Sequence, residues 1–441
     1  MKRLIALLLA AVMCFALCAC GQSAAPAPAQ EAAPAQEAAP AGEAAPAEEA
    51  APAEKVTLTL MNIWCGADSK TTEWTRIINE FNAEYEGVYE IVVEDQPNYD
   101  DYELKMKALV ASGDTPDLFT FKGQVLNDYC TSGQLMDLTA FLAKDEIASR
   151  FKAGTFNGMD FDGSIYCIPY ETAYIPLMYN NKLLEAAGVE VPTSYDELYT
   201  AAEKITASGV TPLTHVTGGN AWFSQLWFTY CLASVAGENA LELAYDSPEW
   251  IEAAELYKTL APISEADLVG GGTQEANGLF FNEKTAIYVN GTWICGRIAN
   301  EGVPGLAEGL TIGGSLAYNG KNGGGMINVN QGYLGAARSD DPAHIAAVEA
   351  FFEFITRAEQ VLPLSKSSGA LFSVDYDESQ LDPGLQTQIL NAGKAASFTI
   401  NTIQNSMSPQ VWGAYLENID ALVLGEITAE QFCQALAAAA E

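Results

Sequence analysis

Histidine and basic residues are scarce in this sequence of 441 residues. It contains two histidines, and 57 aspartates and glutamates oppose its 21 lysines and arginines, which gives a formal net charge of −36. A field of this sign repels phosphate backbones and anionic lipid headgroups, so it argues against nucleic-acid binding. We interpret the charge as an acidic, soluble surface rather than as a specific cation site.

The common catalytic motifs are also missing. The sequence has no His-Glu-x-x-His, Gly-x-Ser-x-Gly or Walker pattern. His215 is expected to be a hydrogen-bonding loop residue, and His344 a solvated one. The glycine runs at 270–272 and 323–325 lack the Lys-Ser/Thr of phosphate loops and instead predict flexible or tightly turning backbone. We therefore expect no enzyme, although so many carboxylates could form a glycosidase-like pair, which leaves a glycoside hydrolase or lyase as the alternative.

Cys-x-x-Cys pairs are absent beyond the first twenty residues. Six of the nine cysteines lie there, namely Cys65, Cys130, Cys167, Cys231, Cys295 and Cys433. Metal clusters and thioredoxin-like chemistry are therefore unsupported, and no metal or other cofactor is expected. An even number permits disulfides outside the cell, but a large core does not require them, so we favour buried free thiols.

The sequence has no apolar run long enough to span a membrane, and the run that comes nearest to that length is a short one at the N-terminus. Lys2 and Arg3 precede an apolar run at 4–16, and LCACG follows at 17–21. This resembles the signal of bacterial lipoproteins, which implies cleavage before Cys20 and lipid attachment to its sulfur. We therefore expect a signal peptide at 1–19 and a protein held on the outer face of the cytoplasmic membrane. An ordinary secretory signal is the alternative.

The next segment, 20–54, is rich in Ala, Pro and Glu and has no large apolar residue from 23 onward. Frequent proline prevents a stable helix, so we predict a disordered, lipid-anchored linker. From Lys55 onward strand and helix patterns alternate. Strands are predicted at 56–60, 90–94 and from 116, with helices over 74–81 and 102–111 between them. Short strand–helix–strand links imply parallel pairing of the strands. Similar strand and helix patterns later in the chain predict two α/β units.

Tryptophans beside Gly, Asn, Ser or Pro are the candidate binding residues. Indoles pack well on the flat C–H faces of pyranose rings, while amides and charged groups near strand ends take the hydroxyls. In parallel α/β folds such groups gather beyond the strand ends. Trp74 and Trp250 are expected in the core, and Trp227 more often core than site. The candidates are Trp64, Lys122, Gln124, Glu171, Trp222, Asn290, Trp293 and Trp412.

Four stretches, in this order, carry a resemblance to a known family. They are ASGDTPDL at 111–118, IPY at 168–170 with LMYNNKLL at 177–184, FFNEKTAIYVNGTW at 280–293, and LGEIT at 424–428. The chain resembles the extracellular solute-binding proteins that include the maltose-binding protein, over about residues 56–436. The resemblance implies a two-lobed periplasmic-binding-protein-like α/β fold. Each lobe would be a mainly parallel sheet flanked by helices, and a hinge would join the lobes.

The resemblance also implies how such a protein works. Lobe 1 would comprise 55–170 plus 330–370, and lobe 2 would comprise 171–329 plus 371–441, with crossings near 169–173, 323–332 and 369–372. Trp293 and Trp412 would stack on sugar rings, Phe121 would be a further aromatic, and Glu171 would stand near the family's carboxylate.

The partners implied are a carbohydrate ligand and the permease subunits of an ABC importer. The protein itself would act as a monomer. A receptor that hands its ligand to a signalling partner is a further possibility.

Overall fold

The computed structural model describes residues 54–441, except for the side chain of Asp100. The predicted signal peptide, the lipidation of Cys20 and the linker up to residue 53 lie outside the described residues. None of the helices between 54 and 441 combines the length and apolar character needed to cross a bilayer.

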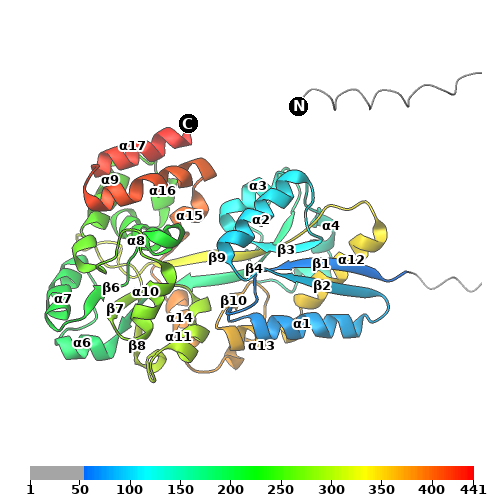
Figure 1. Cartoon of the computed structure of the whole chain (residues 1–441), viewed down its shortest axis with the longest axis horizontal. Helices are drawn as coiled ribbons and strands as arrows, with labels where there is room; N and C mark the ends of the chain where they lie inside the picture. The colour runs from blue at the N-terminus through cyan, green and yellow to red at the C-terminus, as the bar shows by residue number, and fades with distance from the viewer. Residues whose placement is uncertain (1–53) are drawn as a thin grey trace, which may run out of the picture. The chain divides into compact units, whose positions relative to one another are not determined.

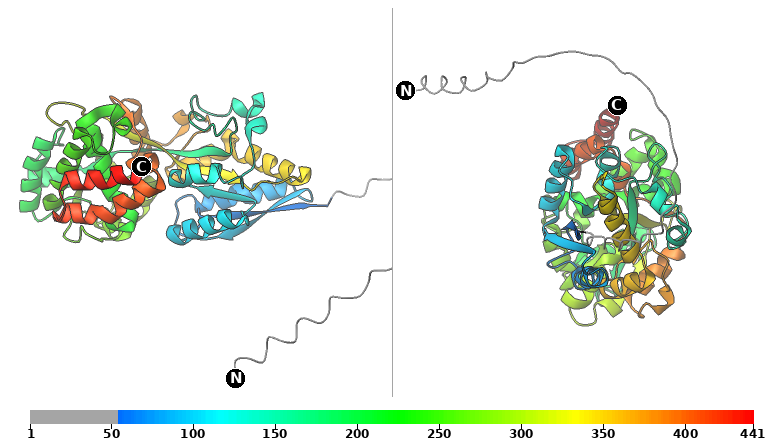
Figure 2. Two further views of the ribbon diagram at one scale, coloured as in Figure 1. Left: turned by 90° about the horizontal axis from the view of Figure 1, so that it is seen from above. Right: turned by 90° about the vertical axis from the view of Figure 1, so that its right-hand side faces the viewer.

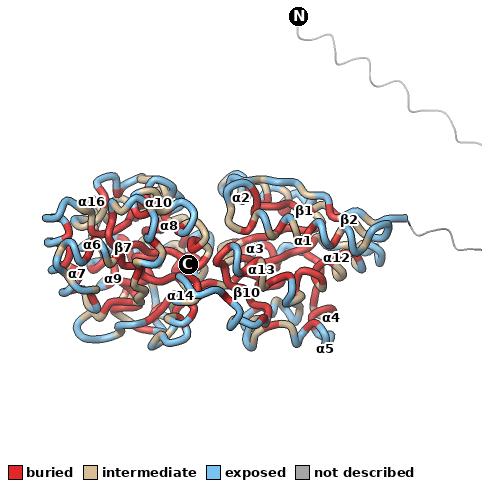
Figure 3. The backbone as a smooth tube through the Cα atoms, turned by 90° about the horizontal axis from the view of Figure 1, so that it is seen from below, coloured by how far each residue is buried: buried red, intermediate tan, exposed pale blue. Residues whose placement is uncertain are grey.

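Two hydrophobic cores organise the described chain, and we call them the first and the second core. The first core is built from residues between 58 and 170 and between 333 and 381, with Leu390. The second core is built from residues between 173 and 329 and from 385 onward. The blue, cyan and yellow segments gather around the first core, and the green and red ones around the second (Figures 1 and 2). Figure 3 shows buried backbone concentrated inside each group.

The helices and strands of the first core come from two separate parts of the chain. They are β1 (Val56–Asn62), α1 (Thr71–Glu84), β2 (Tyr89–Asp95), α2 (Tyr99–Ser112), β3 (Leu118–Phe121), η1 (Gly123–Val125), α3 (Leu126–Cys130), α4 (Thr139–Leu142), α5 (Asp145–Ala148), α12 (Pro342–Ile355), α13 (Ala358–Ser368) and β10 (Leu371–Phe372).

The elements of the second core are mostly helical. They are β5 (Leu177–Asn180), α6 (Asn181–Ala187), α7 (Tyr195–Ala207), β6 (Thr211–Leu213), α8 (Gly218–Ala236), α9 (Pro248–Lys258), α10 (Thr273–Phe281), β7 (Thr285–Val289), η4 (Thr292–Ile294), α11 (Cys295–Glu301), β8 (Leu310–Gly313), α14 (Leu385–Lys394), β11 (Thr399–Ile400), α15 (Ile403–Ser406), α16 (Pro409–Leu424) and α17 (Ala429–Ala440).

The first strand–helix–strand units form as the periodicity predicts. Leu58 and Leu60 alternate with threonines along β1 and point into the core. Helix α1 buries one face, with Trp74 and Phe81 fully covered. Strand β1 pairs in parallel with β2 and with β3, which brings the loops after β1 and β3 to one edge of the sheet.

Two long strands carry the chain between the cores. Strands β4 (Cys167–Ile175) and β9 (Met326–Ala336) pair antiparallel along almost their whole length. Their residues belong to the first core at one end, such as Ile168 and Leu334, and to the second core at the other, such as Ile175 and Ile327. Figure 1 shows β4 and β9 running from one group of elements to the other. The family resemblance implies crossings near 169–173 and 323–332, and β4 and β9 span these residues.

The third passage lies later than predicted. Strand β10 pairs with β4, and the following Val374, Tyr376 and Leu381 still pack in the first core. The chain reaches the second core with Leu385, at the start of α14. Apolar residues thus continue to cover the first core beyond 369–372, where the family resemblance implies the third crossing.

Strand direction also differs from the prediction of mainly parallel sheets. In the first sheet, β9 runs antiparallel to β3 and β4, and β10 runs antiparallel to β4. In the second sheet, β6 and β7 are parallel, but β5 runs antiparallel to both β7 and β8. Both sheets are therefore mixed, and β9 is antiparallel in the first sheet because it enters from the second core.

Local details of helix ends and cysteines follow the sequence. Thr428 and Gln431 form a reciprocal capping box at the start of α17, the Thr-x-x-Gln pattern typical of a helix N-terminus. Ser194 caps α7 by accepting the Glu197 N–H, whereas the Glu197 carboxylate reaches back to Thr193. All six cysteines within 54–441 are buried free thiols in this structure, and Cys130 Sγ lies 3.9 Å from Cys167 Sγ.

Candidate binding site

A cavity of about 590 Å³ lies between elements of the two cores. On the first-core side its wall comes from the loop after β1, the start of α2 and the segment after β3. On the second-core side the wall comes from the starts of α8 and α10 and from the η4–α11 segment. The cavity thus lies where loops leave the ends of strands, which is the usual place for a ligand in open α/β sheets.

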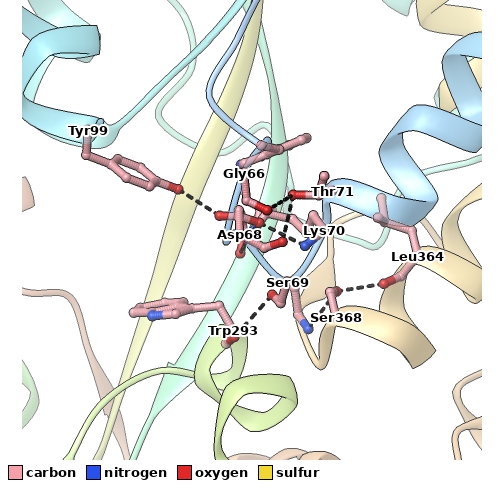
Figure 4. Close-up of polar contacts among 12 residues, drawn as sticks. Gly66, Asp68, Ser69, Lys70, Thr71, Tyr99, Trp293, Leu364 and Ser368 are labelled. Carbon is pink, nitrogen blue, oxygen red and sulfur yellow. Dashed lines mark hydrogen bonds and ion pairs between the residues drawn. The ribbon is translucent and has the colours of Figure 1, made fainter. Parts of the chain in front are cut away.

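The loop after β1 holds a buried group of charges. The Tyr99 hydroxyl donates to Asp68 Oδ2 at 3.2 Å, and Asp68 Oδ1 lies 3.4 Å from Lys70 Nζ (Figure 4). On its other side, Lys70 Nζ lies 3.5 Å from Glu171 Oε1 in β4. The Lys70 side chain is 3% exposed and that of Glu171 is 4% exposed, so the ion pair is shielded from water.

The charge state of Lys70 depends on these two carboxylates. Burial favours the neutral amine, but Asp68 and Glu171 outweigh it and raise the pKa of Lys70 above its ordinary value. Burial raises the pKa of Glu171, and Lys70 opposes that rise. Lys70 Nζ also lies 5.3 Å from the centre of the Trp64 ring, within the range of a cation–π contact. The lysine is therefore charged and fully engaged by protein groups.

Two indoles form an aromatic surface on the opposite wall. The rings of Trp222 and Trp293 lie 5.7 Å apart at 54°, and both side chains line the cavity. Any Cβ on Gly291 would come within 2.2 Å of the Trp293 ring, so glycine is required where this indole folds back over its own loop. Ser69 Oγ donates to the Trp293 carbonyl at 3.4 Å, which joins the two walls at this point (Figure 4).

The backbone ahead of Trp222 takes an unusual path. Asn220 and Ala221 have φ of 56° and 53°, the left-handed region that non-glycine residues rarely occupy. Just before them, Gly218 packs on the glycine run of 270–272, where a Cβ would meet the Gly271 carbonyl at 2.4 Å. The absence of a side chain at Gly218 thus permits close contact with the backbone of 270–271, and Trp222, which follows this turn, lines the cavity.

A short hydrogen-bond chain fixes Asn290 beside the indoles. Asn290 Nδ2 donates to the Tyr288 hydroxyl at 2.7 Å, and that hydroxyl donates to Asn277 Oδ1 at 2.6 Å. Asn290 Oδ1 accepts the Gly291 N–H at 2.9 Å. Asn277 and Asn290 line the cavity, so the second wall carries positioned amides next to its aromatic surface.

Polar groups after β3 complete the first wall. Glu103 in α2 accepts a hydrogen bond from Gln124 Nε2 at 2.9 Å and lies 3.4 Å from Lys122 Nζ. Lys122 Nζ also lies 4.2 Å from the centre of the Tyr99 ring. These four side chains line both the main cavity and a smaller chamber beside it.

Eight of the nine residues predicted from the sequence line one of these two cavities. Lys122, Gln124 and Glu171 line both. Trp222, Asn290 and Trp293 line only the main cavity, whereas Trp64 and Phe121 line only the chamber.

Trp412 is the exception, and its placement corrects our expectation. Its ring stacks on Tyr415 in α16, with centres 5.0 Å apart and planes at 9°, within the second core. Trp412 therefore packs in the second core and is not among the residues that line the two cavities.

The sequence interpretation missed several cavity residues. Asp68, Lys70, Tyr99 and Glu103 were not singled out, nor was Arg297, whose guanidinium is held by Glu301 at 2.7 Å. The available signal for Asp68 and Lys70 was their place between a predicted strand and helix, at the same sheet edge as Trp64.

His215 lies elsewhere and has a structural role. It is fully buried, with Nδ1 3.0 Å from Ser264 Oγ and Nε2 2.8 Å from the Tyr257 hydroxyl. Burial lowers its pKa to about 3, so it stays neutral. Trp74, Trp227 and Trp250 are also fully buried, as predicted.

Comparison with solved structures shows the fold. The chain superposes on a chitin oligosaccharide binding protein with a TM-score of 0.79 and 20% identity, covering 87% of this chain and 98% of that one. It superposes on the maltose-bound MalE3 of T. maritima with a TM-score of 0.71 and 19% identity, covering 87% and 98%. The predicted two-lobed α/β fold class is confirmed.

Sequence comparison shows the family. The maltotriose-binding protein of Pyrococcus abyssi is 24% identical over 48% of this chain and 45% of the relative. The multiple sugar-binding protein of Streptococcus mutans is 25% identical over 57% and 61%. The sn-glycerol-3-phosphate-binding periplasmic protein of Rhizobium meliloti is 26% identical over 60% and 64%, so the chain spans less than two thirds of each of these relatives. The family model described as bacterial extracellular solute-binding protein matches residues 67–362. This match covers more than half of the chain, which therefore belongs to the bacterial extracellular solute-binding protein family.

Proposed function

We propose that this protein captures an uncharged carbohydrate in the main cavity and delivers it to the membrane permease of an ABC importer. The observation that carries the proposal is the pair of indoles, Trp222 and Trp293, facing a wall of amide and charged side chains. Such a surface suits a pyranose, whose ring faces are apolar and whose hydroxyls form hydrogen bonds around the rim. The names of the maltotriose- and multiple-sugar-binding relatives support the same class.

The charges in the cavity favour a neutral ligand over a phosphorylated one. Each of its three cations already has an acidic partner: Asp68 and Glu171 for Lys70, Glu103 for Lys122, and Glu301 for Arg297. A phosphate would have to displace a carboxylate and leave it unpaired, which is costly in a partly dry site. The glycerol-phosphate-binding relative is therefore the less informative guide to the ligand.

The same pairings argue for binding without turnover. On the first wall Asp68, Glu103 and Glu171 each accept hydrogen bonds or contact a lysine, so none stands free as a general acid or base. We therefore place the carbohydrate-active enzyme second. Neighbouring permease genes would favour delivery to an importer over delivery to a signalling receptor.

We also propose a division into lobes that close on the ligand. Lobe 1 would comprise about 55–170 and 330–381, and lobe 2 about 171–329 and 382–441. The later third boundary takes account of Val374, Tyr376 and Leu381, which pack in the first core. Strands β4 and β9 would serve as the hinge, with a register shift in β4 near Glu171.

A ligand screen tests the proposed function. We expect a form lacking residues 1–19 to be stabilised by one or more neutral mono- or oligosaccharides, by about 2.7 kcal/mol at a concentration a hundredfold above Kd. The sugar recovered after incubation should be chemically unchanged by mass spectrometry. Stabilisation by glycerol phosphates but by no sugar would contradict the proposal, as would sugar cleavage that a single carboxylate substitution abolishes.

Lipid anchoring is a second testable part of the proposal. We expect Cys20→Ala to release the protein from membranes, because Cys20 would carry the lipid, while sugar binding by residues 54–441 is unchanged. Fractionation of cells expressing each form, with immunoblotting for the size of the processed chain, provides the measurement. Cys65→Ala, at a buried thiol of the first core, is the matched control and should stay in the membrane fraction. Retention of Cys20→Ala in the membrane with unaltered processing would contradict the lipoprotein assignment.

A further inference from the structure

A small side chamber opens beside the main cavity, within the first core. Its volume is about 40 Å³, and its wall is largely apolar, formed by Trp64, Met106, Phe121, Val125 and Tyr129 among others. About 10–15 Å³ suffices for one water-sized group, so the chamber has room for two or three heavy atoms. Glu103, Lys122 and Gln124 line both spaces and therefore form the mouth between them.

The Tyr102 hydroxyl, which belongs to the chamber wall, is already satisfied by the protein. The Tyr102 hydroxyl donates to the Thr120 carbonyl at 2.8 Å and accepts the Thr120 N–H at 3.2 Å. A space with an apolar lining and few open polar partners favours an apolar group over water. The chamber is therefore suited to a methyl-sized group projecting from a ligand in the main cavity.

Gln124, which lines both spaces, carries a buried hydrogen-bond acceptor that no protein group uses. Gln124 Nε2 donates to the Glu103 carboxylate at 2.9 Å, which fixes the orientation of the amide because an ionised carboxylate only accepts. Gln124 Oε1 is buried and has no hydrogen-bond partner. Leaving a buried acceptor unpaired is unfavourable, so a ligand that donates a hydrogen bond here gains affinity. Lys122 stands at the same mouth and can donate to a carbonyl oxygen.

We propose that the side chamber binds the acetamido group of an N-acetylated sugar, a specificity that rests on the proposed capture of carbohydrate. The methyl enters the chamber, the amide N–H donates to Gln124 Oε1, and the carbonyl accepts from Lys122. An O-acetyl group lacks the N–H donor. The methyl of a 6-deoxy sugar is attached directly to the ring, whereas the acetamido methyl extends further and reaches the chamber while the ring stays on the aromatic surface of the two indoles.

Calorimetry with paired sugars tests this specificity on the form lacking residues 1–19. N,N′-diacetylchitobiose is expected to bind at least about tenfold more tightly than cellobiose, the same β-1,4-linked disaccharide without acetamido groups. D-Fucose and D-galactose, which differ only at C6, form a second pair that tests the deoxy-sugar methyl, and fucose should gain nothing. Equal binding of the two disaccharides, or a preference for fucose, would overturn the acetamido site alone. Failure of every sugar in the screen would overturn the proposed function and this site together.

Two substitutions locate the effect in the chamber. Val125→Phe fills the chamber, and Gln124→Leu removes the acceptor at nearly constant volume; each should reduce the preference for diacetylchitobiose by about tenfold. Gln134→Leu, outside both cavities, is the matched control and should keep the preference. Circular dichroism and thermal melting verify folding, and Gln124→Leu keeps the test decisive where Val125→Phe fails to fold. An unchanged preference in folded Gln124→Leu would overturn the assignment.

Discussion

Replacing Trp293 by alanine is expected to weaken carbohydrate binding by about 2–4 kcal/mol, the range of a binding hot spot. The indole lies at the cavity surface beside Trp222, so its removal takes away half of the aromatic surface. The hydrogen bond from Ser69 goes to the backbone carbonyl of Trp293 and survives the substitution. The free energy of unfolding should therefore fall by only about 1 kcal/mol, the typical effect of a single substitution. Calorimetric affinity and chemical denaturation on the same protein provide the measurement.

A buried tryptophan of the same lobe supplies the control for Trp293. Trp250 is 1% exposed in the second core, so Trp250→Ala should lose about 3–5 kcal/mol of stability, while the folded fraction retains its affinity. Trp412→Ala should now resemble Trp250→Ala, because its ring packs on Tyr415. If Trp293→Ala keeps its affinity but loses stability on the scale of Trp250→Ala, the indole is a core residue and the ligand binds elsewhere.

The sequence predicts which side chains reach a cavity where the neighbouring residues in the chain determine where the side chain lies. Trp64 and Trp293 each follow a strand whose hydrophobic pattern is clear, and both reach a cavity. Gly291 belongs to the same local signal, since the indole of Trp293 folds back over it. Trp412 follows Ser408 and Pro409 in the same way, yet it faces inward. Proximity to a loop does not determine which face of a helix a side chain occupies, and the stack with Tyr415 three residues later decides it here.

Long-range order explains what the sequence could not predict. The antiparallel pairing of β9 with β3 and β4 joins segments more than a hundred residues apart, and no local pattern encodes its direction. The charged side chains at the cavity are likewise brought together by contacts between distant parts of the chain. Glu171 was identified by resemblance, but its partner Lys70 reaches it only because β1 and β4 belong to one sheet. An acid or lysine in a loop is usually solvated, so nothing in the sequence alone marks this pair.

That pair leads to an expected loss of stability as large as that of a core tryptophan. Glu171→Gln preserves the shape of the side chain but removes its charge, leaving Lys70 buried with Asp68 as its only acidic partner. Breaking one side of a buried ion pair costs about 3–5 kcal/mol, since the remaining charge cannot be solvated. An exposed pair should behave differently: Lys144 and Glu349 lie 2.7 Å apart with side chains 44% and 28% exposed. Glu349→Gln should therefore change stability by no more than about 1 kcal/mol.

The double substitution Lys70→Met with Glu171→Gln tests how much of the stability loss comes from the interaction between these two side chains. If the loss in Glu171→Gln comes from the stranded lysine, removing that lysine as well should restore part of the lost stability, and the two effects should not add. Chemical denaturation of the wild type, both single variants and the double variant gives this coupling energy. We also expect weaker sugar binding in Glu171→Gln, because the pair fixes the loop carrying Asp68 and Ser69 to β4, and Ser69 contacts the backbone of Trp293. Additive effects, or a loss no larger than that of Glu349→Gln, would show that the two charges do not depend on each other.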